Sequence, residues 1–231
     1  SFQPGVRVEN NCQNCGFPQV RINGLEGKYT QILIDSRPIF SSLAGVYGLE
    51  QIPTNMIDRV EVVRGGGSAL FGSSAIAGTI NIITKEPRTN SGSLAHTFTN
   101  INGAGAFDNN TTMNLSLVSA DNRAGAYVYG QNRIRSAWDA NGDGFTELSK
   151  MKNQMVGMNA YYKIGTYSKF GLEYHHIEEF RRGGNSLDLP PHIAENPELN
   201  GMGEPGLVEQ TRHSINTGGI KFEWFSKDQR H

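Results

Sequence analysis

The chain has 231 residues, of which 37% are hydrophobic, and a formal net charge of -1 at pH 7. Nothing in this charge balance points to nucleic acid as a partner. The apolar runs are far shorter than the roughly 20 residues of a membrane helix, which excludes a helical membrane protein. A transmembrane β-barrel is not excluded, because its strands need only about 10 residues of alternating character.

Residues 1–87 predict short strands separated by turns and a glycine-rich stretch. The expected strands are 20–22, 30–35 and 57–64, and Arg37 and Pro38 are expected in a turn. From residue 64 onward, glycines and small residues lead into the β-rich segment TINIIT. Leu70 occupies the last glycine position of a G-x-G-x-x-G pattern, and no G-K-[ST] follows. We therefore assign these glycines to turns and close packing rather than to a nucleotide site.

Residues 88–231 predict an antiparallel β-meander, because apolar and polar residues alternate along them. In 155–164 the residues of the apolar face are Val156, Met158, Ala160, Tyr162 and Ile164. The six expected strands lie at about 91–101, 111–119, 123–135, 151–164, 169–181 and 212–226.

The connections between these strands alternate in length. Short turns are expected at 120–123 and 165–168, and long loops at about 102–110, 136–150 and 182–211. Outer-membrane barrels have this alternation, with periplasmic short turns and extracellular long loops. A soluble antiparallel sandwich also has alternating strands, so periodicity alone does not separate the two folds.

Residues 139–147, DANGDGFTE, predict a calcium-binding loop. They match the first half of an EF-hand loop, in which oxygens at alternate positions converge on one cation and Gly144 makes the sharp turn. The candidate ligands are Asp139, Asn141, Asp143 and Glu147. Lys150 stands where the EF-hand has a bidentate glutamate. A solvated turn is the alternative, because Asp, Asn and Gly are also common turn residues.

We expect no enzymatic activity, since no nucleophile, base and orienting group occur together. His175 and His176 are adjacent on an expected strand and point to opposite faces, so one metal ion cannot easily bind both. The nearby Glu178 and Glu179 are expected to line the rim or the lumen of a barrel.

Two stretches resemble a known family. VRINGLEGKYTQILIDSRPI (20–39) and IPTNMIDRVEVVRGGGSALFGSSAIAGTINIITKEP (52–87) look like the second half of the plug domain of TonB-dependent outer-membrane receptors. The cobalamin receptor branch is most similar, around PGVRVENN and SSLAGVYGLEQIP. Ser36 and Gly66 depart from the family pattern, which usually has glycine and proline there, and both are loop positions.

The resemblance implies a fold, a location and a function. The expected fold is a mixed α+β plug segment, 1–87, followed by about six strands, 88–231, of a plugged transmembrane β-barrel of about 22 strands in the outer membrane. Such a receptor binds a scarce nutrient complex, namely a corrinoid, haem or a ferric siderophore, and imports it with energy from the TonB complex. Six strands cannot close such a barrel, and the TonB box would precede Ser1, so we expect a piece of a longer receptor.

The resemblance also implies binding residues and a latch. Loops at the plug apex face the substrate, and their expected contact residues are Asn11, Gln13, Asn14, Phe40, Ser41 and Tyr47. Arg21 and Arg64 match plug arginines that pair with glutamates of the barrel, and their partners are expected on later strands. A buried guanidinium needs such partners. A solvated arginine at a strand end is the alternative.

Cys12 and Cys15 form a Cys-x-x-Cys pattern, which on its own fits a redox pair, a metal site or a disulfide. The periplasmic folding compartment that the resemblance implies is oxidising, so we expect a disulfide. Two thiolates supply only half of a tetrahedral zinc site, and the context of a thioredoxin-like motif is missing. Free thiols, or a thiolate that touches the substrate, stay open.

No cofactor is required, and calcium is the one candidate ion, since the early outer loops of cobalamin receptors are ordered by calcium. The expected partners are the TonB complex, the nutrient complex and outer-membrane lipid. Two alternatives stay open. One is a surface glycan-binding or adhesion module with a β-sandwich fold. The other, within the family, is an importer of oligosaccharide or peptide with a surface lipoprotein as its lid.

Overall fold

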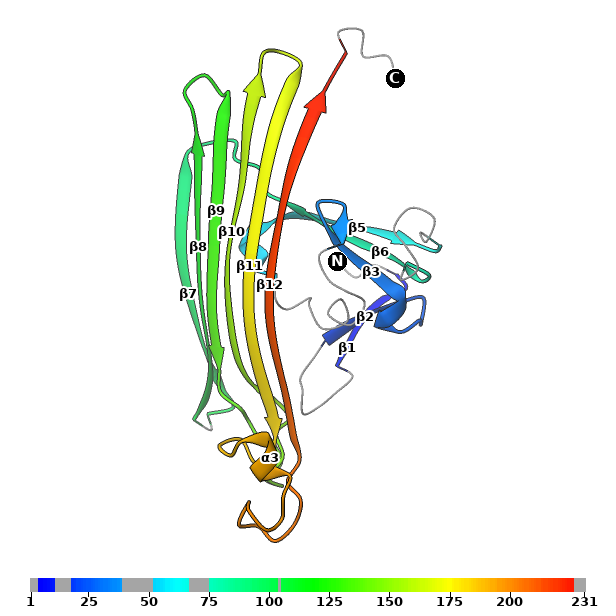
Figure 1. The fold of residues 1–231 in the computed structure, drawn as a ribbon, viewed down its shortest axis with the longest axis vertical. Helices are drawn as coiled ribbons and strands as arrows, with labels where there is room; N and C mark the ends of the chain where they lie inside the picture. The colour runs from blue at the N-terminus through cyan, green and yellow to red at the C-terminus, as the bar shows by residue number, and fades with distance from the viewer. Residues whose placement is uncertain (1–3, 11–17, 39–51, 67–74, 104, 227–231) are drawn as a thin grey trace.

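A computed structural model of the chain describes residues 4–10, 18–38, 52–66, 75–103 and 105–226. It contains a long six-stranded sheet, a four-stranded sheet and a two-stranded sheet. Figure 1 shows the two smaller sheets, which we call the N-terminal unit, against one face of the long sheet. Among the described residues, no helix has both the length and the apolar character needed to cross a membrane.

The N-terminal unit consists of short strands. β1 (Val6–Asn10) and β2 (Pro18–Ile22) pair antiparallel. The other sheet has the order β4-β3-β6-β5 and is formed by β3 (Thr30–Ile34), β4 (Arg37–Pro38), β5 (Ile57–Arg64) and β6 (Gly78–Thr84). Single 3-10 turns, η1 (Gly27–Tyr29) and η3 (Thr54–Met56), precede β3 and β5. The predicted strands at 20–22, 30–35 and 57–64 are confirmed.

The turn between β3 and β4 lies two residues earlier than predicted. Asp35 and Ser36 have φ values of 47° and 66°, so both central residues are in the left-handed region, as tight hairpin turns require. The Asn81 side-chain oxygen accepts a hydrogen bond of 2.9 Å from the Ser36 N–H and holds the turn. Arg37 therefore begins a strand instead of lying in a turn.

The hydrophobic core lies between the N-terminal unit and the long sheet. The buried residues that β3 and β6 contribute are Ile32, Ile34, Ile80 and Ile82. Side chains of the long sheet join the same cluster, namely Tyr127, Tyr129, Met155 and Ile177. The two parts of the chain therefore bury apolar surface against each other, which favours their association.

The long sheet is an antiparallel meander in which neighbours in sequence are neighbours in space. Its strands are β7 (Ser91–Ile101), β8 (Ala106–Val118), β9 (Ala124–Arg135), β10 (Lys150–Ile164), β11 (Ser168–Gly184) and β12 (Val208–Trp224). All six predicted strands are present, most of them slightly longer than expected.

The predicted long loop at 102–110 is wrong. Ile101 pairs with Ala106, so only residues 102–105 connect β7 to β8. The run of polar residues from Asp108 onward suggested a loop. These residues instead belong to β8, in which Phe107 stacks on Phe98 of β7 with ring centroids 6.2 Å apart. The polar run is a strand here because its backbone pairs with β7 on one side and β9 on the other, contacts that a local sequence pattern does not reveal.

The other connections follow the predicted alternation. Residues 119–123 and 165–167 form short turns at one end of the long sheet, and 136–149 and 185–207 form long loops at the other. In the first short turn, the Ser119 hydroxyl donates a hydrogen bond of 2.6 Å to Asp121, which lowers the pKa of that carboxyl. The second long loop contains the helix α3 (Pro191–Ala194).

Two parts of the expected fold are not confirmed. The described residues of 4–84 contain 3-10 turns but no α-helix, so the helical part of the expected α+β plug is not observed there. The long sheet remains open between its edge strands β7 and β12, so the structure gives no closed barrel and no total strand number.

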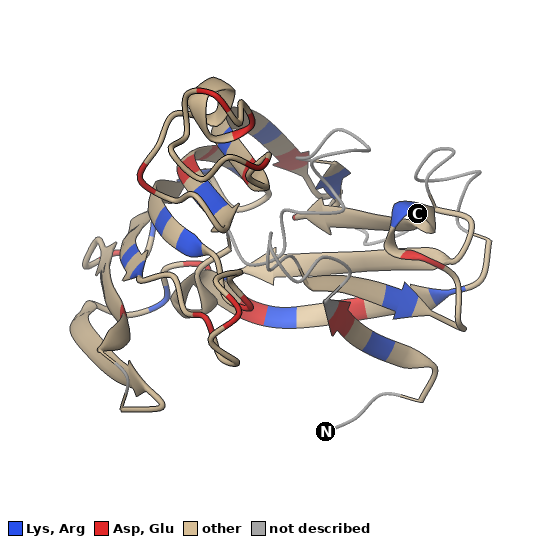
Figure 2. Cartoon of the chain, turned by 90° about the horizontal axis from the view of Figure 1, so that it is seen from below, with Lys and Arg blue, Asp and Glu red and all other residues tan. Residues whose placement is uncertain are grey.

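The two faces of the long sheet differ, as the alternation of apolar and polar residues along its strands predicts. On β10, Val156, Tyr162 and Ile164 point away from the N-terminal unit and are 48%, 53% and 53% exposed. Met151 and Met155 point toward the N-terminal unit and are buried. We call the face toward the N-terminal unit the inner face and the opposite face the outer face. Figure 2 shows the chain from the end with the long loops, where charges of both signs mark loops and strand ends.

Candidate functional site

The inner face of the long sheet carries buried charges near its long-loop end. Arg181 and Glu179 on β11 form an ion pair of 2.9 Å between Nε and Oε1, and both side chains are almost completely buried. Asn153 on β10 donates a hydrogen bond of 3.1 Å to the other carboxylate oxygen of Glu179. Glu178 points to the outer face and is exposed, so only one of the two predicted inner glutamates faces inward.

An ion pair joins the N-terminal unit to the inner face. The Arg37 guanidinium on β4 lies 2.6 Å from Oε1 of Glu173 on β11 and also donates to the Ile220 carbonyl oxygen on β12 at 3.3 Å. The Arg37 side chain is 43% exposed and that of Glu173 is 24% exposed. This pair connects residues 136 positions apart in the chain and is the contact that a plug latch would make.

Gly219 on β12 makes room for this pair. A Cβ atom added there would overlap the guanidinium of Arg37 and crowd the carboxylate of Glu173. Any side chain at this inward position would therefore displace the arginine. The absence of a side chain at residue 219 is what leaves space for the Arg37 guanidinium beside β12.

Further contacts hold the N-terminal unit at two more places on the inner face. At η3, the Asn55 amide donates to the Met113 carbonyl oxygen at 3.0 Å, and the Tyr127 hydroxyl donates to the Asn55 carbonyl oxygen at 2.8 Å. At the end of β6, the Thr84 hydroxyl accepts a hydrogen bond of 2.6 Å from Asn159 and donates to Asp35. Tyr127 and Asn159 are cross-strand partners, and Asn159 also pairs with Glu173, so these contacts and the ion pair of Arg37 lie in one row of the inner face.

The two arginines predicted as latch residues have other partners in the structure. Arg21 on β2 lies 2.6 Å from Glu9 on β1. Arg64 at the end of β5 donates a hydrogen bond of 2.8 Å to the Pro4 carbonyl oxygen. Among the described residues, neither contacts a carboxylate of the long sheet, and their pairing with later strands stays a prediction.

Sequence reasoning missed Arg37 as a latch residue. Its partner could have been suspected, because Glu173 falls at an inward position between the outward Leu172 and Tyr174. Nothing local to Arg37 points to that partner, since the contact depends on how the N-terminal unit packs on β11.

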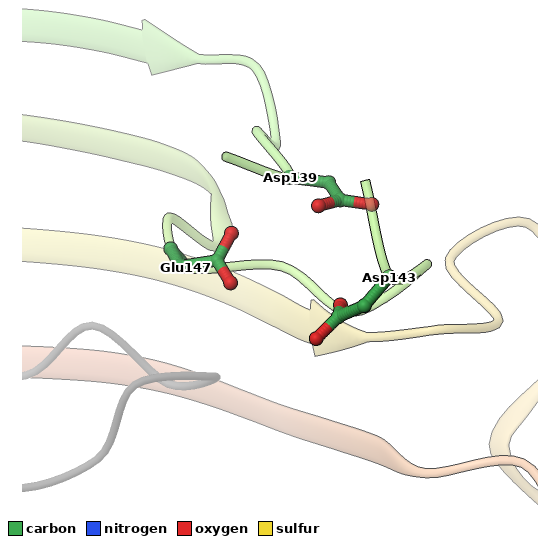
Figure 3. A group of neighbouring side chains, drawn as sticks. All are labelled: Asp139, Asp143 and Glu147. Atoms are coloured by element: carbon green, nitrogen blue, oxygen red, sulfur yellow. The ribbon is translucent and has the colours of Figure 1, made fainter. Parts of the chain in front are cut away.

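Three of the four predicted calcium ligands converge in the loop between β9 and β10 (Figure 3). The fourth, Asn141, donates a hydrogen bond of 3.0 Å from its side-chain amide to the Asp143 carboxylate. The carboxylates of Asp139, Asp143 and Glu147 each offer an oxygen, and these oxygens lie within 4.8 Å of one another. Two ligands that each lie about 2.4 Å from one calcium ion are at most about 4.8 Å apart, so this spacing fits calcium. Asp139, Asp143 and Glu147 thus satisfy the distance condition for one shared ion.

The backbone of the loop is held in place by the same side chains. Asp139 accepts hydrogen bonds from the N–H groups of Gly142 and Gly144, at 2.7 and 2.8 Å. The Asn141 side chain accepts one from the Asp143 N–H at 2.9 Å. Gly142 and Gly144 have φ values of 78° and 88°, a conformation that glycine adopts without strain. The predicted turn residues therefore form a turn that these hydrogen bonds hold.

Other predicted positions can be placed only in part. The expected substrate contacts and both cysteines lie outside the described residues, namely Asn11, Cys12, Gln13, Asn14, Cys15, Phe40, Ser41 and Tyr47. His175 is buried on the inner face, where it contacts the Tyr129 hydroxyl, and His176 points outward and contacts Asn216 at 2.8 Å. The two histidines therefore point to opposite faces, as predicted.

The fold and the contacts together define a class of protein. A curved meander has one face of apolar residues open to its surroundings, and a small mixed unit is anchored by polar contacts to the other face. This is the arrangement of a β-barrel receptor with an internal plug.

Comparison with known proteins shows similarity to one family. The sequence model described as "TonB-dependent Receptor Plug Domain" matches residues 1–79. The vitamin B12 transporter BtuB of Vibrio vulnificus is 37% identical over 91 residues, which are 39% of this chain and 15% of that protein. The ferric enterobactin receptor PirA of Pseudomonas aeruginosa is 33% identical over 111 residues, 42% of this chain and 15% of that protein. Residues 1–79 are thus similar to the plug domain of TonB-dependent receptors.

A solved structure extends the likeness of the fold to nearly the whole chain. The siderophore receptor PirA of Acinetobacter baumannii superposes with a TM-score of 0.67 at 18% identity and covers 95% of this chain. This chain covers 41% of that receptor, so it spans less than half of the solved relative. From here on we call the N-terminal unit the plug.

Proposed function

We propose that the chain is part of an outer-membrane active-transport receptor that binds a scarce nutrient complex and imports it with energy from the TonB complex. The observation that carries the proposal is the plug anchored to the charged inner face of a sheet whose outer face is apolar. A plug so placed closes a channel, so a substrate can pass only if the plug moves or rearranges. The cell outer membrane is the location that this family and this fold fit.

The proposed organisation assigns each end of the long sheet to a compartment. Residues 1–87 form part of the plug, and residues 88–231 form the first strands of the barrel. The short turns at 119–123 and 165–167 face the periplasm, and the long loops at 136–149 and 185–207 face the outside, as in other outer-membrane barrels. The described residues do not form a closed barrel, so the total of about 22 strands stays an expectation.

The proposed substrates are a corrinoid, haem or a ferric siderophore. The relatives support two of these classes, since one matched protein is a vitamin B12 transporter and another is a ferric enterobactin receptor. The proposed contact residues at the plug apex offer amide and hydroxyl groups beside aromatic surface, which suits a large ligand with a polar rim.

Two further features belong to the proposed receptor. Calcium bound by Asp139, Asn141, Asp143 and Glu147 would order an extracellular loop, and the spacing of the three carboxylates supports this. A disulfide between Cys12 and Cys15 would stiffen the apex loop.

A surface lipoprotein lid remains the alternative within the family. The adhesion module is set aside because residues 1–79 match a plug domain.

Calorimetry on the complete receptor in detergent tests the proposed function. Cobalamin, haem and ferric siderophores are titrated separately, and one class is expected to bind with at least micromolar affinity. A matched titration uses a variant with Phe40 and Tyr47 replaced by alanine, which should bind that ligand more weakly. Absence of binding for all three classes, in protein that is folded and requires detergent, would contradict the substrate assignment.

A further inference from the structure

The chain segment that connects β6 to β7 lines a cavity at the short-turn end of the inner face. Figure 1 shows this segment crossing from the plug to the long sheet in its short-turn half. The cavity has a volume of about 240 Å³, and the connecting segment, the turn before β9 and strands β10 and β11 all contribute to its lining. Its polar and aromatic lining residues are Glu86, Arg88, Asn122, Tyr161, Lys163 and Lys169.

The charge of this lining is unbalanced. Arg88, Lys163 and Lys169 supply three positive charges and Glu86 supplies one negative charge, which leaves a net charge of +2. The Lys169 ammonium lies 2.8 Å from the Glu86 carboxylate. Among the described residues, no carboxylate forms an ion pair with Arg88 or Lys163. The lining therefore offers two unopposed positive charges to a ligand.

The two lysines of the cavity repel each other across the sheet. Lys163 on β10 and Lys169 on β11 are direct cross-strand partners, and like charges directly opposite each other destabilise a sheet. Glu223 is the partner of Lys169 on β12, but its carboxylate already lies 2.7 Å from the Lys221 ammonium. An anion between Lys163 and Lys169 would remove their repulsion, so the register of the strands itself points to a ligand.

Tyr161 holds both lysines at the cavity. The ammonium groups of Lys163 and Lys169 lie 5.5 and 5.3 Å from the centre of its ring, within the range of an attractive cation–π contact. The ring itself packs over Gly125, where an added Cβ atom would lie 2.5 Å from the tyrosine ring and 2.9 Å from Pro87. The positions of the two cations are therefore partly set before any ligand binds.

We propose that this cavity binds a phosphate group, either as the free ion or as part of a soluble phosphate monoester. A phosphate monoester carries a charge close to −2 near neutral pH, which matches the net charge of the lining. Arg88 can donate two parallel hydrogen bonds to it, and Lys163 and Lys169 can each donate to another oxygen. The cavity opens on the inner face, so the wall strands separate it from the lipid that meets the outer face.

The ligand would strengthen the attachment of the plug to the wall. This inference rests on the proposed function, which places the short turns in the periplasm. A bound phosphate would join Arg88 of the connecting segment to Lys163 and Lys169 of the wall. The same segment already contacts β8, where the Ser116 hydroxyl donates a hydrogen bond of 2.7 Å to the Thr89 carbonyl oxygen. The end of the plug would then be held to three strands of the long sheet.

Titration of the complete receptor with inorganic phosphate, in neutral detergent and at constant ionic strength, tests the site. We expect the wild type to bind phosphate with a Kd of about 1 mM or lower. The test variant Arg88→Gln/Lys163→Gln should bind about tenfold more weakly, because both substituted charges are exposed and each contributes modestly. The control variant Lys28→Gln/Lys150→Gln removes two exposed cations that lie away from the cavity and should bind like the wild type.

A substitution at Glu86 should have the opposite effect. Glu86→Gln removes the acid of the lining and frees Lys169 from its partner, so this variant should bind phosphate more tightly than the wild type. Damage to the fold could not produce tighter binding. Hydrogen exchange of residues 85–90 should also slow when phosphate is added to the wild type, and it should change less in Arg88→Gln/Lys163→Gln.

The outcomes separate the phosphate site from the receptor function. Equal binding by the wild type and the test variant, or weaker binding by Glu86→Gln, would overturn the site while the receptor function stands. Binding that disappears at physiological ionic strength would show an adventitious ion only. Glycerol phosphate that binds more tightly than inorganic phosphate would identify the ligand as a monoester, and weaker binding would identify it as the free ion.

Two further results would contradict parts of the proposal. Succinate, a dicarboxylate, should bind more weakly than phosphate, and an equal affinity would contradict the assignment to phosphate. The expected order of the variants in a complete protein that is soluble without detergent would instead contradict the receptor function and leave the phosphate site in place.

Discussion

Arg37 and Glu173 are the residues that tie the plug to the long sheet through charge. Their side chains are partly exposed, so we expect a coupling energy of about 0.5 to 1 kcal/mol rather than that of a buried pair. A double-mutant cycle with Arg37→Ala and Glu173→Gln in the complete receptor measures it through hydrogen exchange of residues 30–38. The exposed pair Lys28 and Glu26, both within the plug, is the control and should leave exchange at the plug contact unchanged. Zero coupling between Arg37 and Glu173 would contradict the latch.

Gly219 gives a second test of the same contact. Gly219→Ala places a methyl group where the Arg37 guanidinium lies, so we expect it to weaken the plug contact about as much as Arg37→Ala. In an Arg37→Ala background the same substitution should have little further effect. Gly218→Ala, whose nearest neighbour is 3.4 Å away on the outer face, is the control. If the two substitutions weaken the plug contact additively, Gly219 does not act through Arg37, and this explanation of the glycine is wrong.

The buried pair of Glu179 and Arg181 should matter far more to stability. Glu179→Gln takes the carboxylate from a buried arginine, and we expect a loss of about 3 to 5 kcal/mol. Glu178→Gln changes the adjacent residue on the exposed outer face and should stay within about 0.5 kcal/mol. Thermal unfolding of the complete receptor in detergent compares the two. Similar melting temperatures for both variants would contradict the assigned burial.

At the scale of elements, the loop between β9 and β10 is the part that an ion should order. We expect calcium to protect the chain near Gly142 from proteolysis, because the three carboxylates repel one another without a cation. Asp139→Asn/Asp143→Asn should remove this protection. Asp188→Asn, an exposed acid in the other long loop, should leave it intact. Identical cleavage in chelator and in millimolar calcium would rule out the site.

Most strands of the long sheet could be predicted because, toward the short turns, apolar outward residues alternate with mostly polar inward residues. The start of β8 could not, because Asp108 and its polar neighbours lie on a strand where sequence favours a loop. The contact of Arg37 could not be predicted either, since it joins β4 to a strand 136 residues away. Local sequence patterns therefore predict the strands, whereas the contacts of the plug can be seen only in the folded structure.

The organisation of the whole molecule depends on which face of the long sheet meets lipid. The plug covers the inner face over the shared core, so lipid can reach only the outer face. The apolar residues of the outer face and the polar anchors of the inner face are both consequences of this arrangement.

Lipid quenching along β10 tests this claim most directly. Single cysteines at positions 156, 162, 159 and 163, in a complete receptor with Cys12→Ser and Cys15→Ser, carry a fluorescent label in bilayers with brominated acyl chains. The account predicts strong quenching at Val156 and Tyr162 and little at Asn159 and Lys163, because successive residues alternate between lipid and the interior. Equal quenching at all four positions would contradict the placement of this sheet in the wall of a plugged barrel.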